Sequence, residues 1–181
     1  MSVSVTNNEG GRPTMATIEE LLQELDEEAH STRRVLERVP DDRLEWRPHA
    51  KSLTLGQLAM HVATIPGALA DVATWPAFDV RTEIPRPTAA STAELLQALD
   101  RSVADAKALL RGMGNDALAT PWRLVSGDRE IATFPRGAFL RSTMLNHWYH
   151  HRGQLTVYLR QTGALIPAIY GDSADEKMAA P

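Results

Sequence analysis

Two histidines near the C-terminal end of the chain have a spacing that suits a metal site. His147 and His151 are four residues apart within the segment 140–160. In an α-helix their rings would point the same way, one turn apart. They flank an apolar face made by Met144, Trp148, Leu155 and Leu159. Two inward imidazoles at this spacing can bind one metal ion, as paired histidines do in helical zinc sites.

A third imidazole is expected from His61. It lies in the middle of an apolar stripe in the segment 54–75 that comprises Leu58, Val62, Ile65, Leu69 and Val72. A polar ring in that position needs a partner, because burying it unpaired costs a few kcal/mol. Together with His147 and His151 it would supply three ligands from two helices. Such a set leaves at least one position open on a zinc- or nickel-like ion, which is typical of a catalytic rather than a structural site.

Other interpretations of these residues stay open. A lone inward histidine is more often a hydrogen-bonded core residue than a ligand, so His61 can also be explained by packing. His150 lies three residues after His147 and offers another pair, although it would lie farther from the apolar face. Gln154, one turn beyond His151, is expected to orient that ring or to face a substrate. No carboxylate can be identified from spacing as a general acid or base, so the expected reactive group is a metal-bound water or thiolate.

The elements that must position these residues are mainly helices. Helical periodicity predicts helices over 17–39, 54–75, 91–113 and about 137–161, with Pro66 causing a kink or an irregular turn in the second. A capping box is expected at Ser91–Glu94. Alternating polar and apolar residues at 122–125 and 130–133 predict a small hairpin around 126–129. The predicted fold class is all-α: an antiparallel four-helix bundle with a small β-hairpin before the last long helix.

The composition of the chain excludes several classes of protein and of metal site. The chain has 181 residues, which is the size of one ordinary domain, and no cysteine, so any metal must use histidine, carboxylate or water. The formal net charge is -4 with no dense basic cluster, which argues against a nucleic-acid partner. No apolar run approaches the roughly 20 residues that cross a bilayer, and the N-terminus lacks a signal-peptide core. No membrane partner is therefore expected, and a cytoplasmic location is the default.

The domain organisation is predicted to be simple. Residues 1–15 are expected to form a disordered N-terminal lead, and residues 16–181 a single domain. Met1 and Met15 are both possible starts. Several other side chains are predicted to have ordinary structural roles. Packing is expected for Trp46, Trp122 and Trp148; a solvated surface for Arg152, Arg160 and the run 19–28; and exposure without a partner for His30 and His49.

Two stretches resemble the DinB/YfiT-like family, and the likeness covers nearly the whole chain from about residue 17. One stretch is 147–160, His-Trp-Tyr-His-His-Arg-Gly-Gln-Leu-Thr-Val-Tyr-Leu-Arg, with Thr-Gly at 162–163 and Pro-Ala-Ile-Tyr-Gly at 167–171. The other is 46–61, which begins Trp-Arg-Pro-His and ends Ala-Met-His. The resemblance implies a four-helix bundle in which His61, His147 and His151 hold a divalent metal ion, and it makes a homodimer plausible.

What the resemblance implies about activity is a metal-dependent enzyme, with bacillithiol or mycothiol S-transferases as the model. An open metal site can bind a thiol as thiolate at neutral pH and so create a strong nucleophile. The preferred prediction is a low-molecular-weight-thiol S-transferase that acts on a small-molecule substrate and uses zinc or nickel. A metal-dependent hydrolase is one alternative, because the same site can activate water. A non-enzymatic bundle that binds a metal or a small ligand is another.

Overall fold

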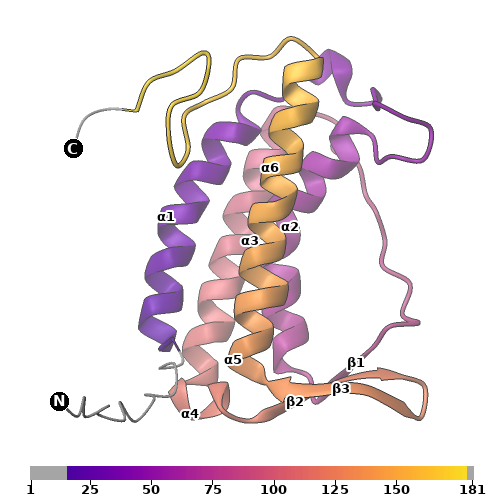
Figure 1. Cartoon of the computed structure of the whole chain (residues 1–181), viewed down its shortest axis with the longest axis vertical. Coiled ribbons are helices and arrows are strands. Elements are labelled where there is room, and N and C mark those ends of the chain that lie inside the picture. The colour runs from indigo at the N-terminus through magenta and orange to yellow at the C-terminus, as the bar shows by residue number, and fades with distance from the viewer. Residues whose placement is uncertain (1–15, 179–181) are drawn as a thin grey trace, which may run out of the picture.

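The computed structural model describes residues 16–178, which are mostly helical and include one small sheet (Figure 1). The predicted lead at 1–15, including Met15, lies outside the described residues, and the single domain over 16–181 stays a prediction. The long helices are α1 (Ile18–Leu36), α2 (Leu55–Thr74), α3 (Thr92–Met113) and α6 (Asn146–Gln161). They lie side by side, with α2 packed against both α3 and α6 and with α1 packed against α3. Among the described residues, no helix is both long and apolar enough to cross a bilayer.

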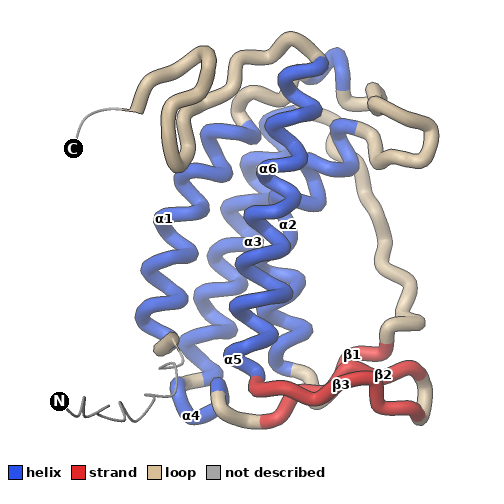
Figure 2. The backbone as a smooth tube through the Cα atoms, viewed as in Figure 1, coloured by secondary structure: helices blue, strands red, loops and turns tan. Residues whose placement is uncertain are grey.

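The sheet and two short helices lie at one end of the long helices (Figure 2), and the short 3-10 helix η1 (Asp41–Arg43) lies in the connection at the other end. The sheet contains β1 (Ala77–Asp79), β2 (Pro121–Ser126) and β3 (Arg129–Pro135), and the short helices beside it are α4 (Asn115–Leu118) and α5 (Arg136–Phe139). The predicted hairpin is confirmed as the antiparallel pair of β2 and β3, and its turn contains Gly127 at φ 60°. The strand β1 was not predicted. It pairs parallel with β2, with Ala77 opposite Arg123.

The helix directions differ from the predicted antiparallel order. Because β1 directly follows α2 and pairs with β2, which follows α3 and α4, both α2 and α3 end at the sheet. These two helices therefore run in the same direction, while α1 and α6 run in the opposite one (Figure 1). The long connection at 75–91 makes this possible, since it carries the chain back to the far end of the molecule before α3 begins. A regular antiparallel four-helix bundle is thus not confirmed.

Side-chain caps begin the first three long helices. Thr17 with Glu20, and Thr54 with Gln57, each form a complete capping box. At α3 only half of the predicted box forms. Ser91 accepts a hydrogen bond from the backbone N–H of Glu94, but the Glu94 carboxylate accepts from Ala90 instead of closing the box on Ser91. The helix still begins where predicted, since one capped N–H and the acidic residue remain at its positive end.

The last long helix is less regular than predicted. Residues 136–161 divide into α5, a π-helical segment η2 (Leu140–Leu145) and α6. A π-helical turn holds an extra residue, so it changes the angle at which the following residues leave the helix axis. The segment ends directly before α6, which carries His147 and His151. Single π-turns of this kind are frequent beside functional sites.

The core centres on α2, which is apolar on several sides. Its buried residues include Leu55, Leu58, Ala59, Val62, Ala63, Ile65, Ala70 and Ala73. Gly67 lets α3 approach closely, because a Cβ there would lie 2.9 Å from the backbone oxygen of Ser102. The helix continues through Pro66 without an irregular turn. Trp122 and Trp148 are fully buried and Trp46 is half-buried, which confirms their predicted packing roles.

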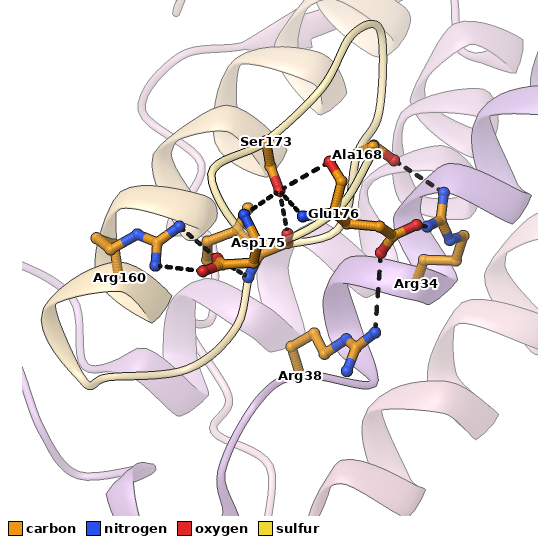
Figure 3. Close-up of polar contacts among 8 residues, drawn as sticks. Arg34, Arg38, Arg160, Ala168, Ser173, Asp175 and Glu176 are labelled. Atoms are coloured by element: carbon orange, nitrogen blue, oxygen red, sulfur yellow. Dashed lines mark hydrogen bonds and ion pairs between the residues drawn. The ribbon is translucent and has the colours of Figure 1, made fainter. Parts of the chain in front are cut away.

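The chain after α6 is irregular but is held by specific contacts (Figure 3). The Arg34 guanidinium, on α1, donates to the carbonyl of Ala168 at 2.8 Å and pairs with Glu176. Asp175 pairs with Arg160 and accepts from the backbone N–H of Ile166. These contacts fix the last described residues against α1 and α6. Arg160 is exposed, as predicted, but it forms an ion pair with Asp175.

Candidate metal centre

Three histidines from two helices converge at one place. His61 on α2 lies beside His147 and His151 on α6, and each offers a ring nitrogen within 4.8 Å of the other two. The His147 and His151 ring centroids are 4.5 Å apart, and those of His61 and His151 are 4.7 Å apart. All three rings are half-buried. Such a set of imidazoles could hold a divalent metal ion, since imidazole suits zinc and nickel and three ligands leave a position open.

A proline in α2 leaves a backbone carbonyl available to a side chain of α6. Pro66 has no backbone N–H, so the carbonyl of Val62, four residues earlier, lacks its usual helical partner. The indole N–H of Trp148 donates to this carbonyl at 2.8 Å inside the core. Val62 follows His61 in the chain, and Trp148 follows His147. This bond therefore joins the two histidine-bearing helices directly beside the histidines.

Burial keeps the three imidazoles neutral at neutral pH. Burial, as the largest cause, and the neighbouring His151, His147 and Arg86 together lower the pKa of His61 from 6.5 to about 4. Burial also lowers the pKa of His147 and of His151, although the backbone of Thr143 opposes the shift at His147 and a hydrogen bond with Gln154 opposes it at His151. A neutral imidazole has a free lone pair, which is the state that binds a metal ion.

Gln154 occupies the position expected from the sequence. Its side-chain oxygen lies 2.8 Å from Nδ1 of His151. When that oxygen accepts, Nδ1 carries the proton and the lone pair of Nε2 is free for a ligand bond. Partners of this kind orient a ligand ring and raise its basicity. Gln154 also lines the cavity described next, so it can serve both of its predicted roles.

The three histidines open onto a cavity of about 390 Å³. Part of the lining comes from α2 and α6, namely Gln57, Thr64 and Gln154, and from Leu53, two residues before α2. The rest of the lining comes from the connection between α2 and α3, namely Ile84, Pro85, Arg86 and Pro87. No carboxylate lines this cavity among the described residues. A small molecule could therefore reach the open side of a metal ion held by the histidines.

The other histidines lie outside the cluster. His150 is exposed, and although its ring centroid is 4.8 Å from that of His151, it is not part of the converging set. The spacing preference for the pair His147 and His151 over His147 and His150 therefore matches the geometry. His30 and His49 are exposed, as predicted. The nitrogen Nδ1 of His49 does accept a hydrogen bond, from the backbone N–H of Lys51 at 3.1 Å.

The prediction for Arg152 is wrong. Its side chain is 2% exposed and pairs with Glu28 of α1 at 2.6 Å. It also donates to the hydroxyl of Thr32 and to Tyr170, and its guanidinium lies over the rings of Tyr149 and Tyr170. Nearby Glu24 accepts from Tyr149 and pairs with Arg141, so the run 19–28 is not wholly solvated either. The sequence signal was position: Arg152 follows Trp148 by four residues and precedes Leu155 by three, which places it on the apolar face.

A mostly helical fold with three histidines that could hold a metal ion therefore defines the class of this protein. The chain belongs to the DinB family, whose sequence profile matches residues 1–179. It is 27% identical over 164 residues to the YrdA protein of Bacillus subtilis (strain 168), an alignment that covers 88% of this chain and 92% of that one.

Solved structures of DinB-like proteins have the same fold. A protein from Bacillus cereus ATCC 10987 superposes with a TM-score of 0.67 at 25% identity, covering 87% of this chain and 100% of that one. YjoA of Bacillus subtilis gives 0.59 at 19% identity, covering 80% and 92%. A putative DinB-family member from Exiguobacterium sibiricum 255-15 gives 0.52 at 19% identity, covering 86% and 97%. The resemblance inferred from the sequence is thus confirmed at the level of the family.

Proposed function

We propose that this protein is a divalent-metal-dependent enzyme that transfers a low-molecular-weight thiol to an electrophilic small molecule. His61, His147 and His151 would hold the ion, with zinc or nickel as the metals that suit three imidazoles. One observation carries the proposal: three imidazoles with lowered pKa values converge on the wall of a cavity large enough for a small substrate. When bound, the ion lowers the pKa of a thiol so that it reacts as a thiolate at neutral pH.

The residues of the chain have complementary tasks in this scheme. We propose that the four long helices form a bundle and that their packing holds the three histidines in place. In this bundle α2 and α3 run in the same direction. Gln154 holds His151 with Nε2 free. Leu53 and Ile84 supply apolar surface at the cavity, which limits the water that can compete with the thiol. Gln57 and Thr64 offer hydrogen-bonding groups to the substrate.

The lining of the cavity favours thiol transfer over the hydrolase alternative. A metal hydrolase commonly uses a carboxylate beside the ion as a general base for the attacking water. Among the described residues no Asp or Glu lines the cavity. A thiol bound to the ion would need no such base, because its lowered pKa would let the proton pass to solvent water at neutral pH. The new S–C bond then forms from the sulfur lone pair, and the leaving group of the electrophile departs with its bonding electrons.

The first experiment tests the ligand set. Protein purified without chelator is expected to contain about one divalent ion per chain by elemental analysis. His61→Ala and His147→Ala are each expected to lose the ion while the helical circular-dichroism signal persists. His150→Ala is the matched control and should keep the ion, since His150 is exposed and outside the cluster. Full occupancy in the His61 and His147 variants would overturn the proposal.

The second experiment separates an enzyme from a binding protein. Metal-loaded protein is mixed with a panel of thiols and electrophiles and, in parallel, with a panel of esters. Consumption of a thiol that stops in His147→Ala supports the transferase. Ester hydrolysis without thiol consumption would support the hydrolase. A bound ion with neither reaction would support the non-enzymatic metal- or ligand-binding bundle.

A further inference from the structure

The cavity beside the histidines has an unusual charge for this chain. The whole chain carries a formal net charge of -4, yet the cavity is lined by no carboxylate among the described residues. Its one charged side chain is Arg86. Arg86 is exposed to the cavity and solvent, and within the described residues it has no ion-pair partner. Before any ion is bound, the one formal charge on the described lining is therefore positive, while Glu83 lies in the adjoining hollow.

The backbone around Arg86 limits the positions that its side chain can take. Pro85 and Pro87 flank it, and each proline fixes its own φ and restricts the residue before it to extended conformations. The connection is also anchored beyond Pro87. Gly56 at the start of α2 lets Thr88 approach so closely that a Cβ would lie 2.5 Å from its hydroxyl, and Ala89 is buried. In Figure 1 this connection runs from β1 along the outside of the helices to the start of α3.

Charge balance then limits what the cavity can accept. Three neutral imidazoles would not offset the charge of a divalent ion, and Arg86 adds one more positive charge to the same lining, close enough to act on the pKa of His61. A single thiolate would neutralise only part of this sum. Separated positive charges in a partly water-excluded cavity attract an occupant that carries negative charge at both places. A guanidinium binds a carboxylate or phosphate through two parallel hydrogen bonds, which makes it the preferred reader of such groups.

We propose that the substrate is an anionic thiol: its sulfur lies at the histidines, and a carboxylate or phosphate group at its other end binds Arg86. This inference rests on the proposed function, which supplies the metal site for the sulfur. Arg86 thus selects among thiols by charge, and it acts without contact with the reacting sulfur. Neutral thiols of similar size fit the same space but leave the guanidinium without its partner.

The test uses cobalt-substituted protein, because a sulfur ligand on cobalt changes its visible absorption spectrum. Titrations with 3-mercaptopropionate, neutral 2-mercaptoethanol and cationic cysteamine give three dissociation constants. The expected result is that 3-mercaptopropionate binds about 10-fold more tightly than 2-mercaptoethanol, and cysteamine most weakly. Arg86→Ala should abolish this order while the spectral change with 2-mercaptoethanol persists, and Arg86→Lys should restore part of it. Inorganic phosphate and acetate then serve as competitors of 3-mercaptopropionate. The stronger competitor shows whether Arg86 prefers a phosphate or a carboxylate group.

Arg111→Ala is the matched control. Arg111 is also exposed, but it lies at a separate hollow between α1 and α3, so its loss should leave all three constants unchanged. Equal binding of the three thiols by the unchanged protein, with a normal spectral change, would overturn the role of Arg86 and leave the proposed function intact. Failure to bind cobalt would instead refute the metal site. In that case Arg86 is tested on the metal-free protein, where succinate should shift NMR signals of the cavity residues, and absence of an Arg86-dependent shift would overturn the inference.

Discussion

Polar side chains on two sides of α6 differ in whether they find partners within the chain. On one side, Arg152 is buried with Glu28, Thr32 and Tyr170, so its hydrogen-bonding groups have partners within the chain. On the other side, His147 and His151 direct ring nitrogens toward His61 and a cavity. A neutral imidazole has one donor and one acceptor nitrogen, yet among the described residues no hydrogen bond joins one of these rings to another. Only His151 has a side-chain partner there, Gln154. The comparison teaches that a polar group paired inside the chain stabilises the fold, while a converging set without such pairs indicates an external ligand.

The largest expected effect is on the paired side. Glu28→Ala leaves the buried guanidinium of Arg152 without its carboxylate, which is expected to lower the free energy of unfolding by about 3–5 kcal/mol. Urea unfolding of metal-free protein measures this change, and the metal content at neutral pH should stay near that of the unchanged protein. Asp100→Ala is the control, because it removes the partner of Arg33 from a pair that is mostly exposed, and it should cost less than about 1 kcal/mol. Similar losses in both variants would contradict the distinction.

A smaller effect is expected from Trp148→Phe, which connects the two sides. The variant keeps an aromatic ring but leaves the Val62 carbonyl without a donor, so the free energy of unfolding should fall by about 1–3 kcal/mol. Metal affinity should fall as well, because α2 and α6 lose the bond that aligns His61 with His147. Trp122→Phe removes a similar indole bond, to the carbonyl of Val72, far from the cluster. It should reduce stability without weakening metal binding, as measured by competition with a chelator of known affinity.

The smallest expected effect is on the pH dependence of stability, in which the histidine cluster and the ion pairs beside Arg152 contribute at different pH values. Since burial lowers the pKa of His61 from 6.5 to about 4, the unfolded chain binds a proton below pH 6.5 that the folded chain does not. Stability of metal-free protein should therefore fall as the pH decreases from about 6.5 toward 4. After allowance for partial exposure, about 1–2 kcal/mol is expected between pH 7 and pH 5. Glu24, whose pKa is lowered by its hydrogen bond with Arg141, adds a loss only below about pH 4.5.

Urea titrations of His61→Asn and the unchanged protein at pH 7 and pH 5 measure this difference. The variant lacks the group that titrates, so its stability should change less over this range. His49→Asn, which replaces an exposed histidine on the connection before α2, should show the same pH slope as the unchanged protein. An identical slope in all three proteins would place the pH dependence elsewhere.

The histidine cluster could be predicted because it depends on local geometry. Helical spacing fixes the relation of His147 to His151, and an apolar stripe around His61 shows that this ring faces inward. The misjudged Arg152 had the same kind of positional signal, since it lies between Trp148 and Leu155 on the apolar face. The charge of the side chain favours a solvated surface, whereas its position on the helix favours burial. A buried arginine becomes predictable only when its partner is known, and Glu28 is more than a hundred residues away in the chain.

The features missed by sequence analysis all depend on contacts between distant segments. The strand β1 has three residues, too few to show alternation, and it exists through parallel pairing with β2. The common direction of α2 and α3 follows from that pairing. The segment 84–87 has no helical or strand periodicity, so nothing in the sequence pattern places Arg86 in one cavity with the histidines. The sequence predicts only a distortion at Pro66. It does not show that the carbonyl freed by this proline accepts a hydrogen bond from a residue on another helix.

The connection between α2 and α3 contributes no imidazole to the cluster and, apart from Ala89, little to the buried core. Its replacement would therefore change the chemistry that the cavity selects while the ligand set and the helices stay as they are. Under the proposed function, variation in length and sequence at 80–88 would alter the charge and the apolar surface offered to a substrate and leave the three histidines in place. Exchange of this stretch between relatives is accordingly a direct way to transfer substrate preference.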